Sequence, residues 1–485
     1  MSRNLTRATL HGTFWSYASR YSGKLLVFVS TAVLARVLLK EEFGIAGYAL
    51  VIIGFMEVLE GLGIGPAIIY HRADTDRLDT AFWLGLGVGG VLFALSYFVA
   101  APLAGAFFQD PRAVPVTRAL GLAFLISAFS LVHAALLMQK LAFKRKFVPE
   151  MARSASKGIA SIVLALLGFG AWSLILGQLA GVLVQTVVYW LVVPWRPALR
   201  FQRRMVRSLL GYGSSVVSIN GLGILLLNVD YLLIGRFMGA AALGVYTLAF
   251  RVPELLVKQL CNVVGNVTFP VYAQMRDDPQ ALRRGFLLTM RYLTMITIPL
   301  GLGLALVAEP FVLVVFGERW AEAVPVTAAI SLYMLLRSLV FNAGSVYKAV
   351  GRPSLLSRLS LLQAVVAVPA LWWTVATTES LVAVAWMQVL LAFLAGGLKL
   401  TMAARLVDLR LRDLLRTFAP SLLAGGVMAL AVWSVGQLLT DVLPLLALVL
   451  ETAVGALVYG GILLLLQREA LRQAHGVLRR ALVRG

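Results

Sequence analysis

The sequence contains about fourteen apolar runs, each close to the length that crosses a lipid bilayer. A transmembrane helix needs about 20 mostly apolar residues, and such runs follow one another along nearly the whole chain. Hydrophobic residues make up 60% of the sequence and charged residues only 13%, whereas soluble domains carry about 25% charged residues. The chain is therefore expected to be an all-α polytopic membrane protein. The predicted spans cover residues 10–37, 43–69, 81–105, 116–139, 150–170, 172–194, 208–234, 242–269, 287–308, 322–347, 354–376, 380–403, 414–437 and 442–466.

Basic residues are distributed unevenly among the connections between these spans. The even-numbered connections and both tails carry most of them. The odd-numbered connections carry only Arg36, Lys40, Arg112, Arg118, Arg236 and Arg319. Because Lys and Arg collect on the cytoplasmic side of membrane proteins, the pattern predicts that both termini are cytoplasmic and that the number of crossings is even. The same bias explains the net charge of +21, so we expect no nucleic-acid partner.

The connections are short, which leaves no room for a soluble catalytic or nucleotide-binding domain. Cys261 is the only cysteine, and the four histidines are scattered without metal-ligand spacing. We therefore expect neither a metal nor a cofactor, and no enzymatic activity. One dinucleotide-binding fingerprint, Gly85-x-Gly87-x-x-Gly90, lies inside an apolar span with no strand before it. Its glycines are better interpreted as sites of close helix packing.

The sequence also shows a weak internal repeat. A shift of 200 residues aligns Phe43-Gly44-Ile45 with Leu243-Gly244-Val245. Six spans separate the two copies, so both have the same orientation, which is typical of transporters that rock one lobe against the other around a central cavity. The repeat predicts a first lobe over residues 1–200 and a second lobe over 201–408, each of six helices. Residues 409–485 would add two accessory helices and a basic tail.

Ionisable residues inside spans cost about 2.5–3.5 kcal/mol each at mid-helix and by default mark a pathway. Arg20 and Lys24 stand four residues apart on the first span, so they share one helix face and repel each other. Such a face needs water, acids or an anionic ligand. One interpretation is a wet cavity that receives an anion. The other is pairing with Glu57 and Glu60 on the neighbouring span.

A second charged stripe lies on the eighth span, where Arg251, Glu254 and Lys258 follow helical spacing. Glu254 and Lys258 have the favourable order for an ion pair. Because the first and eighth spans belong to different lobes, their cations could grip one phosphate-bearing substrate between them. Arg337 lies on the tenth span, and two roles are left open for it. It could donate a hydrogen bond to a neighbouring backbone carbonyl, or it could contact the substrate.

The acidic residues inside spans are candidates for ion pairing or for proton coupling. Glu57, Glu60 and Asp230 are the candidates for coupling, and Glu254 for pairing with Lys258. Asp230 lies near the outer end of its span and could serve the fold instead. The coupling ion itself, whether proton, sodium or none, is left open by the sequence.

Several motifs bear on the family of the chain. The first half contains Phe43-Gly44 and Gly61-Leu-Gly63-Ile-Gly65. The second contains Asn228-Val-Asp230-Tyr-Leu-Leu-Ile-Gly235-Arg236, Leu243-Gly244-Val-Tyr246, Pro253 and Phe269-Pro270. Together with the fourteen-span plan, these residues resemble polysaccharide-export flippases of the multidrug/oligosaccharidyl-lipid/polysaccharide exporter superfamily. The resemblance covers the whole chain, is clearest over 10–72 and 206–278, and is nearest to the Wzx-type branch.

This resemblance implies a function. Such proteins move undecaprenyl-pyrophosphate-linked oligosaccharide units across the bacterial inner membrane for exopolysaccharide or O-antigen synthesis. It implies that Arg20, Lys24, Arg251 and Lys258 line a central cationic cavity, and that the last two spans form a groove for the lipid tail. Membrane lipids and polysaccharide polymerase or co-polymerase proteins are the implied partners.

Two other transport functions remain open in the same superfamily. A multidrug cation antiporter would need a net acidic cavity, whereas the first and eighth spans together hold four bases and one acid. A flippase for the peptidoglycan lipid precursor is nearer in chemistry, and the sequence does not separate it from the first choice. A membrane-embedded polymerase or ligase is disfavoured, because it would need a larger outer loop.

Overall fold

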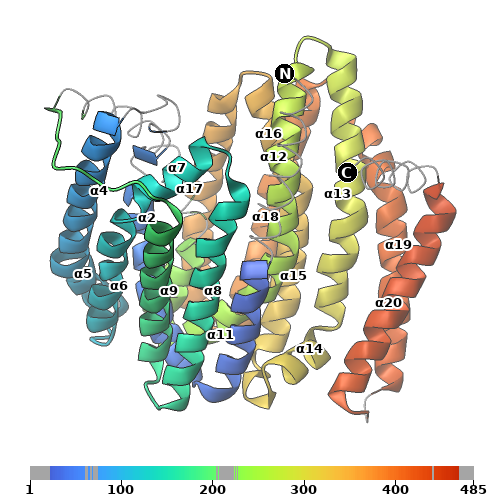
Figure 1. The fold of residues 1–485 in the computed structure, drawn as a ribbon. Helices are drawn as coiled ribbons and strands as arrows, with labels where there is room; N and C mark the ends of the chain where they lie inside the picture. Colours follow the sequence, from blue (N-terminus) through green and yellow to red (C-terminus); the bar gives the residue numbers. More distant parts are fainter. Residues whose placement is uncertain are drawn as a thin grey trace. The chain divides into compact units, whose positions relative to one another are not determined.

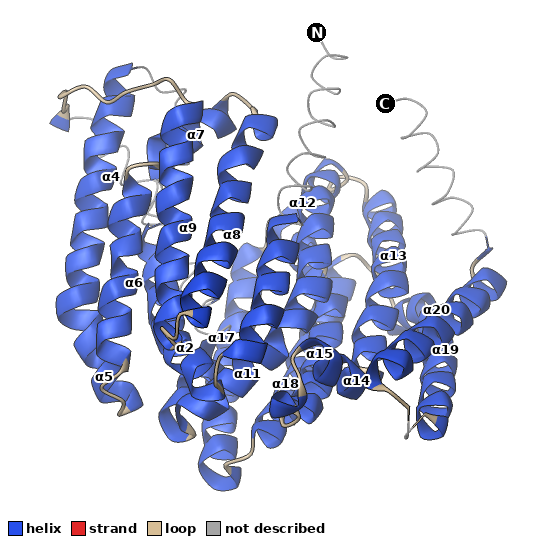
Figure 2. Cartoon of the chain, turned by 60° about the horizontal axis from the view of Figure 1, so that its bottom comes forward, coloured by secondary structure: helices blue, strands red, loops and turns tan. Residues whose placement is uncertain are grey.

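The computed structural model describes residues 22–60, 75–203, 228–439 and 442–468, with single residues at 64, 65, 68, 206, 223 and 226. Within these ranges the chain forms helices joined by short loops, and it contains no strand (Figure 2). A spanning segment in lipid must satisfy its own backbone hydrogen bonds, and an α-helix does so within one segment. The prediction of an all-α fold is confirmed for this part of the chain.

The chain divides into two compact units, Met1–Thr247 and Leu248–Gly485. The two lobes and the accessory C-terminal helices predicted from the repeat remain a prediction. The described helices of unit 1 are residues 22–37, α2 (Lys40–Glu60), α4 (Thr75–Leu95), the π-helical turn η1 (Ser96–Ala100), α5 (Ala101–Phe108), α6 (Ala113–Ala128), α7 (Leu131–Gln139), α8 (Phe143–Leu166), α9 (Ala171–Val192) and residues 228–237 (Figure 1). Helix α11 (Gly239–Pro253) contributes its first residues to unit 1.

Unit 2 begins within α11 and continues through the π-helical turn η2 (Glu254–Lys258). Its further elements are α12 (Gln259–Gln274), α13 (Pro279–Leu306), α14 (Ala308–Val315), η3 (Glu318–Trp320), α15 (Ala323–Phe341), α16 (Ala343–Ala349), α17 (Pro353–Thr378), α18 (Leu381–Leu406), α19 (Leu411–Leu438) and α20 (Pro444–Leu466). Local chemistry sets the starts of these helices. Asp278 accepts hydrogen bonds from the backbone N–H groups of Gln280 and Ala281, and Pro279 occupies the first helical position.

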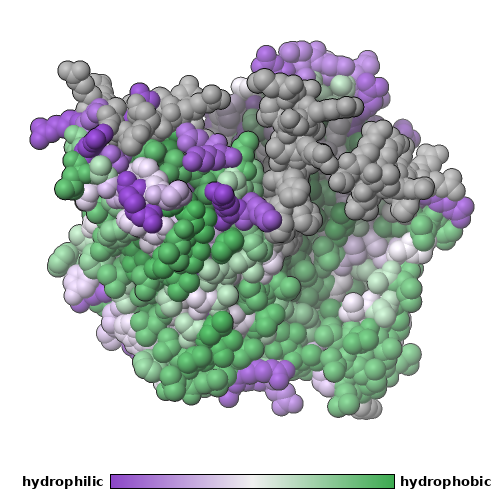
Figure 3. Space-filling model, in the orientation of Figure 1, coloured by the Kyte–Doolittle hydropathy of each residue, from purple (hydrophilic) through white to green (hydrophobic). Residues whose placement is uncertain are grey.

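Among the described residues, nine helices are long and apolar enough to cross a membrane, or ten if the bent pair α6 and α7 counts as one span. Leu191, Leu438 and Leu457 are 76–82% exposed, as expected of side chains that face lipid. Figure 3 shows hydrophobic side chains over most of the visible face and hydrophilic ones near its upper and lower margins. The protein is a multi-pass membrane protein. The number fourteen and the cytoplasmic termini remain predictions.

Two glycines aligned by the repeat meet in one helix crossing of unit 1. A Cβ atom added to Gly44 on α2 would lie 1.7 Å from the carbonyl oxygen of Ala240, and one added to Gly244 on α11 would lie 1.9 Å from that of Lys40. Lys40 and Ala240 are themselves aligned by the same shift of 200 residues. The crossing is therefore reciprocal, as an internal two-fold repeat predicts.

The packing role predicted for the glycine fingerprint on α4 is wrong. A Cβ at Gly85 would make only ordinary contact with Leu131, and one at Gly87 or Gly90 would meet no atom of the described residues within 4 Å. The close approach occurs instead at Gly89, whose Cβ would lie 2.8 Å from the carbonyl oxygen of Phe124 on α6. The helix face that packs is set by the neighbouring helix, and the spacing of the fingerprint carries no information about that neighbour.

Candidate functional site

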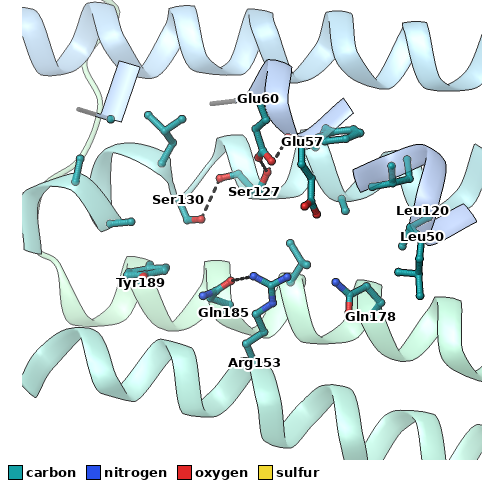
Figure 4. Close-up of a pocket in the computed structure, with 18 of the residues that line it drawn as sticks. Leu50, Glu57, Glu60, Leu120, Ser127, Ser130, Arg153, Gln178, Gln185 and Tyr189 are labelled. Carbon is teal, nitrogen blue, oxygen red and sulfur yellow. Dashed lines mark hydrogen bonds between the residues drawn. The ribbon is translucent and has the colours of Figure 1, made fainter. Parts of the chain in front are cut away.

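A pocket of about 680 Å³ lies inside unit 1, among α2, α6, α7, α8 and α9. Figure 4 shows polar side chains pointing into it from above and below in the view, among them those of Glu57, Arg153 and Gln185. Apolar residues, among them Leu50, Phe124 and Leu131, complete its wall. Polar groups that converge on one hollow between apolar helices are the usual mark of a ligand site.

Helix α2 supplies the two carboxylates of the pocket. Glu57 and Glu60 stand three residues apart, so they point from neighbouring turns of the same face. Glu60 Oε1 accepts a hydrogen bond from the hydroxyl of Ser127 at the end of α6. Glu57 is exposed and reaches further into the hollow (Figure 4).

A bend between α6 and α7 shapes the opposite wall. The two helices meet at an angle of 48°. Ser127 lies in the last turn of α6, and Ser130 lies in the break, directly before α7. The hydroxyl of Ser130 donates to the carbonyl oxygen of Ser127 at 3.0 Å, which ties the two helix ends together. Thr186 of α9 donates to the carbonyl oxygen of Ile126 at 3.1 Å. Both hydrogen bonds end on backbone carbonyls in the last turn of α6, directly before the bend.

Helices α8 and α9 form the floor and lie side by side (Figure 1). Gly177 and Gly181 permit this approach. A Cβ at Gly177 would lie 1.9 Å from the hydroxyl oxygen of Ser161, and one at Gly181 would lie 3.0 Å from the carbonyl oxygen of Arg153. The close contact brings the Arg153 side chain beside α9, where its Nη1 donates to Gln185 Oε1 at 3.4 Å.

One face of α9 lines the pocket with Gln178, Val182, Gln185 and Tyr189. Their spacing of four, three and four residues places them in a single stripe along the helix. The Oε1 atom of Gln178 is buried and has no hydrogen-bond partner among the described residues. A buried acceptor left without a donor costs about 1–3 kcal/mol.

The formal charge of the pocket is −1, from two carboxylates and the guanidinium of Arg153. The described part of the chain contains no group of three or more His, Cys, Asp or Glu side chains that could hold a metal ion. The pocket therefore offers hydrogen-bond donors, acceptors and one excess negative charge.

The predicted cationic residues fall in different places. Arg20 lies outside the described residues, so its pairing with Lys24 is not tested. Lys24 lies on the helix over residues 22–37, which packs on α8, with Ser22 beside Met151. In unit 2, Lys258 forms an ion pair with Glu254 within η2. Arg251 lies in the last turn of α11.

Two further predicted residues have partners within the fold. Asp230 is only 1% exposed, and it accepts a hydrogen bond from the hydroxyl of Tyr246 at 2.7 Å. This contact favours a structural role. Arg337 of α15 donates to the hydroxyl of Tyr333, one turn away, at 3.1 Å.

Sequence reasoning missed most of the polar residues of the pocket, among them Arg153, Gln178 and Gln185. Arg153 lies inside the span predicted over 150–170, and its position there was the available signal. The two glutamines recur seven residues apart in an otherwise apolar run, and this spacing was a second signal.

The chain was compared with known proteins. A family model described as "Polysaccharide biosynthesis protein" matches residues 33–325. The chain is 29% identical to the teichuronic acid biosynthesis protein TuaB of Bacillus subtilis (strain 168), over 87% of this chain and 90% of that protein. It is 28% identical to the lipopolysaccharide biosynthesis protein WzxC of Escherichia coli (strain K12), over 76% of this chain and 75% of that protein.

The fold resembles that of a solved membrane protein. The structure of the lipid II flippase MurJ in an inward closed conformation matches with a TM-score of 0.74, over 94% of this chain and 99% of that chain. The two sequences are 13% identical. This likeness concerns the fold alone.

Proposed function

The chain belongs to the family of polysaccharide biosynthesis proteins, among Wzx-type relatives of the multidrug/oligosaccharidyl-lipid/polysaccharide exporter superfamily, and from this premise we propose that it is a lipid-linked oligosaccharide flippase. It would move undecaprenyl-pyrophosphate-linked repeat units across the bacterial inner membrane, for exopolysaccharide or O-antigen synthesis. The observation that carries the proposal is the family match over residues 33–325 in a multi-pass helical protein.

The physical need for such a protein follows from its cargo. A sugar-bearing diphosphate carries negative charges and many hydroxyl groups, and burying them unpaired in hydrocarbon is very costly. A protein path lowers this cost by supplying cations and hydrogen-bond partners. Alternating access between a lobe over 1–200 and a lobe over 201–408 would open the path to each side in turn. Residues 409–485 would hold the lipid tail outside.

In this proposal Arg20, Lys24, Arg251 and Lys258 bind the diphosphate. Lysine and arginine form strong charge-assisted hydrogen bonds with phosphate oxygens. The ion pair between Lys258 and Glu254 means that a diphosphate would compete with this carboxylate for the ammonium group. Substrate binding would then free Glu254 to accept a proton or another donor.

Glu57 and Glu60 are the acids best placed for coupling, because they share one pocket with Arg153. Asp230 is less suited, since Tyr246 hydrogen-bonds to it in a buried position. Replacing both glutamates with glutamine keeps their shape and removes the exchangeable charge. If a proton gradient drives export, this double variant should lose its dependence on that gradient.

Alanine variants of Lys24 and Lys258 test the function. We expect each to reduce polysaccharide export by at least about tenfold in cells that lack their own copy, since a hydrogen bond to a charged group is lost. Amounts of inserted protein, measured in the membrane fraction, should stay unchanged. Lys140→Ala is the matched control, because Lys140 is an exposed lysine in the connection between α7 and α8.

Full polysaccharide output from the double variant Lys24→Ala/Lys258→Ala would reject the assignment of these cations. Failure of the unaltered protein to move lipid-linked oligosaccharide between the leaflets of reconstituted vesicles would reject the function itself. Accumulation of the lipid-linked unit on the inner leaflet in the deletion strain is the complementary result that the proposal requires.

A further inference from the structure

The polar groups of the unit 1 pocket are spread out rather than gathered at one point. Gln178 and Gln185 are seven residues apart on α9, which at the rise of an α-helix is about 10 Å. Tyr189 extends the stripe by another turn, and Glu57 and Glu60 face it from α2 (Figure 4). A site of this length suits a ligand with several polar groups of its own.

A bare ion does not match the spread-out arrangement of the polar groups in this pocket. An ion draws its ligands around one centre, and no metal-binding cluster occurs in the part of the chain that the structure describes. The guanidinium of Arg153 inside the pocket also repels cations. A proton would bind at one carboxylate and would make no contact with the side-chain amide of Gln178, which lies elsewhere in the pocket.

The mixture of donors and acceptors fits a polyhydroxylated ring. Carboxylates only accept hydrogen bonds, guanidinium only donates, and side-chain amides and hydroxyls do both. Each hydroxyl of a sugar likewise donates one hydrogen bond and accepts others. The apolar side chains of Leu50, Phe124 and Leu131 would cover its C–H faces. A volume of about 680 Å³ lies within the usual range of small-molecule sites.

We propose that this pocket binds a sugar ring of the transported oligosaccharide, so that unit 1 recognises the glycan. The inference rests on the proposed flippase function and adds to it a subsite for the sugar. Gln178 lines the pocket, and its Oε1 has no hydrogen-bond donor among the described residues, so its side-chain amide would turn to let this oxygen accept a hydrogen bond from one ring hydroxyl. Gln185, whose carbonyl oxygen is held by Arg153, presents its amide N–H groups to another.

The arrangement gives the site a basis for selectivity. Polar groups that are buried when the ligand is bound penalise an analogue that lacks the matching hydroxyl, because they are then left unpaired. Glu57 and Glu60 take part as acceptors, and this role does not conflict with carrying a proton. Glutamine at these two positions would still accept hydrogen bonds from the sugar.

The test uses the full-length protein in vesicles and two lipids. One is the lipid-linked repeat unit extracted from the cells that make it, and the other is the same lipid diphosphate with its sugars removed. We expect Gln178→Ala/Gln185→Ala to move the sugar-bearing lipid about tenfold more slowly than the unaltered protein does, and to move the sugar-free lipid at an unchanged rate. Gln280→Ala, at an exposed glutamine of α13, should change neither rate.

Each outcome decides the matter. Equal slowing of both lipids, or of neither, overturns the sugar subsite. Gln178→Glu keeps an acceptor at this position and should retain most of the rate for the sugar-bearing lipid, which separates a lost hydrogen bond from a damaged fold. If the unaltered protein moves neither lipid, the proposed flippase function is wrong, and the sugar subsite is rejected with it. If it moves both but the glutamine variants do not discriminate, only the subsite is lost.

Discussion

A methyl group added at Gly44 tests the reciprocal helix crossing of unit 1. On the present backbone its Cβ would lie 1.7 Å from the carbonyl oxygen of Ala240, whereas real Cβ atoms essentially never come closer than 3.0 Å to such an atom. Helices α2 and α11 must therefore separate locally by at least 1.3 Å, the difference between these distances. The obstructing atom belongs to the backbone, so no side chain can rotate away. Overpacking of this kind costs about 1–3 kcal/mol of stability.

The assay is survival of the purified protein after stepwise heating in detergent, followed by size-exclusion chromatography. Gly54→Ala is the matched control, because it lies on the same helix and its Cβ would meet no atom of the described part of the chain within 4 Å. We expect Gly44→Ala and Gly244→Ala each to lower heat resistance, while Gly54→Ala leaves it unchanged or raises it slightly.

The two damaging substitutions should also be less than additive when combined. The separation forced by one methyl group makes room for the other, since both act on the same crossing. If Gly44→Ala survives heating as well as Gly54→Ala, or if the losses from Gly44→Ala and Gly244→Ala add in full, the reasoning is refuted.

Two further predictions concern single carboxylates. Burial alone would raise the pKa of Asp110, which lies in the loop between α5 and α6, but the hydrogen bonds and positive charge of Arg112 hold this pKa below its ordinary value of 3.8. The contact therefore contributes fully to stability above the ordinary pKa of 3.8, and the contribution is lost as the pH falls through the lowered pKa. Asp110→Asn should cost about 1 kcal/mol at pH 7 and progressively less as the pH is taken below 3.8, as measured by urea unfolding at a series of pH values. Asp230→Ala should reduce heat resistance, because the hydroxyl of Tyr246 loses its buried partner, and export per folded molecule should stay normal. A folded variant that no longer exports would instead give Asp230 a direct role in transport.

The positions of most spans follow from the sequence because apolar runs end at local signals. The span predicted over 354–376 is α17, Pro353–Thr378, which starts with proline and ends before Glu379 in a left-handed conformation. The start of α8 differs more. The prediction placed it at residue 150, yet the helix begins at Phe143. Its first turns carry Lys144, Arg145 and Lys146, which hydropathy assigns to a loop although they are compatible with a helix.

The pocket was only half predictable. Glu57 and Glu60 stand out in an apolar span because an ionised group there is costly. Gln178 and Gln185 carry no charge, so their seven-residue spacing in an apolar run is a weaker signal, and their shared role is evident only once α2 and α9 are seen to line the same pocket. The pair Glu254 and Lys258 was predicted from helical spacing and is present. The π-helical turn that contains both residues leaves no trace in an apolar periodicity based on the α-helix.

The bend between α6 and α7 runs through the wall of the pocket, with Ser127 before it and Ser130 within it. A ligand that contacts both α6 and α7 has different affinities for different angles of the bend. By thermodynamic reciprocity, the free energy by which ligand binding stabilises one bend angle equals the free energy by which that angle strengthens ligand binding. For a ligand that binds the bent form more tightly, straightening the bend by a distant substitution or by a change in lipid thickness would weaken binding without altering any group that contacts the ligand.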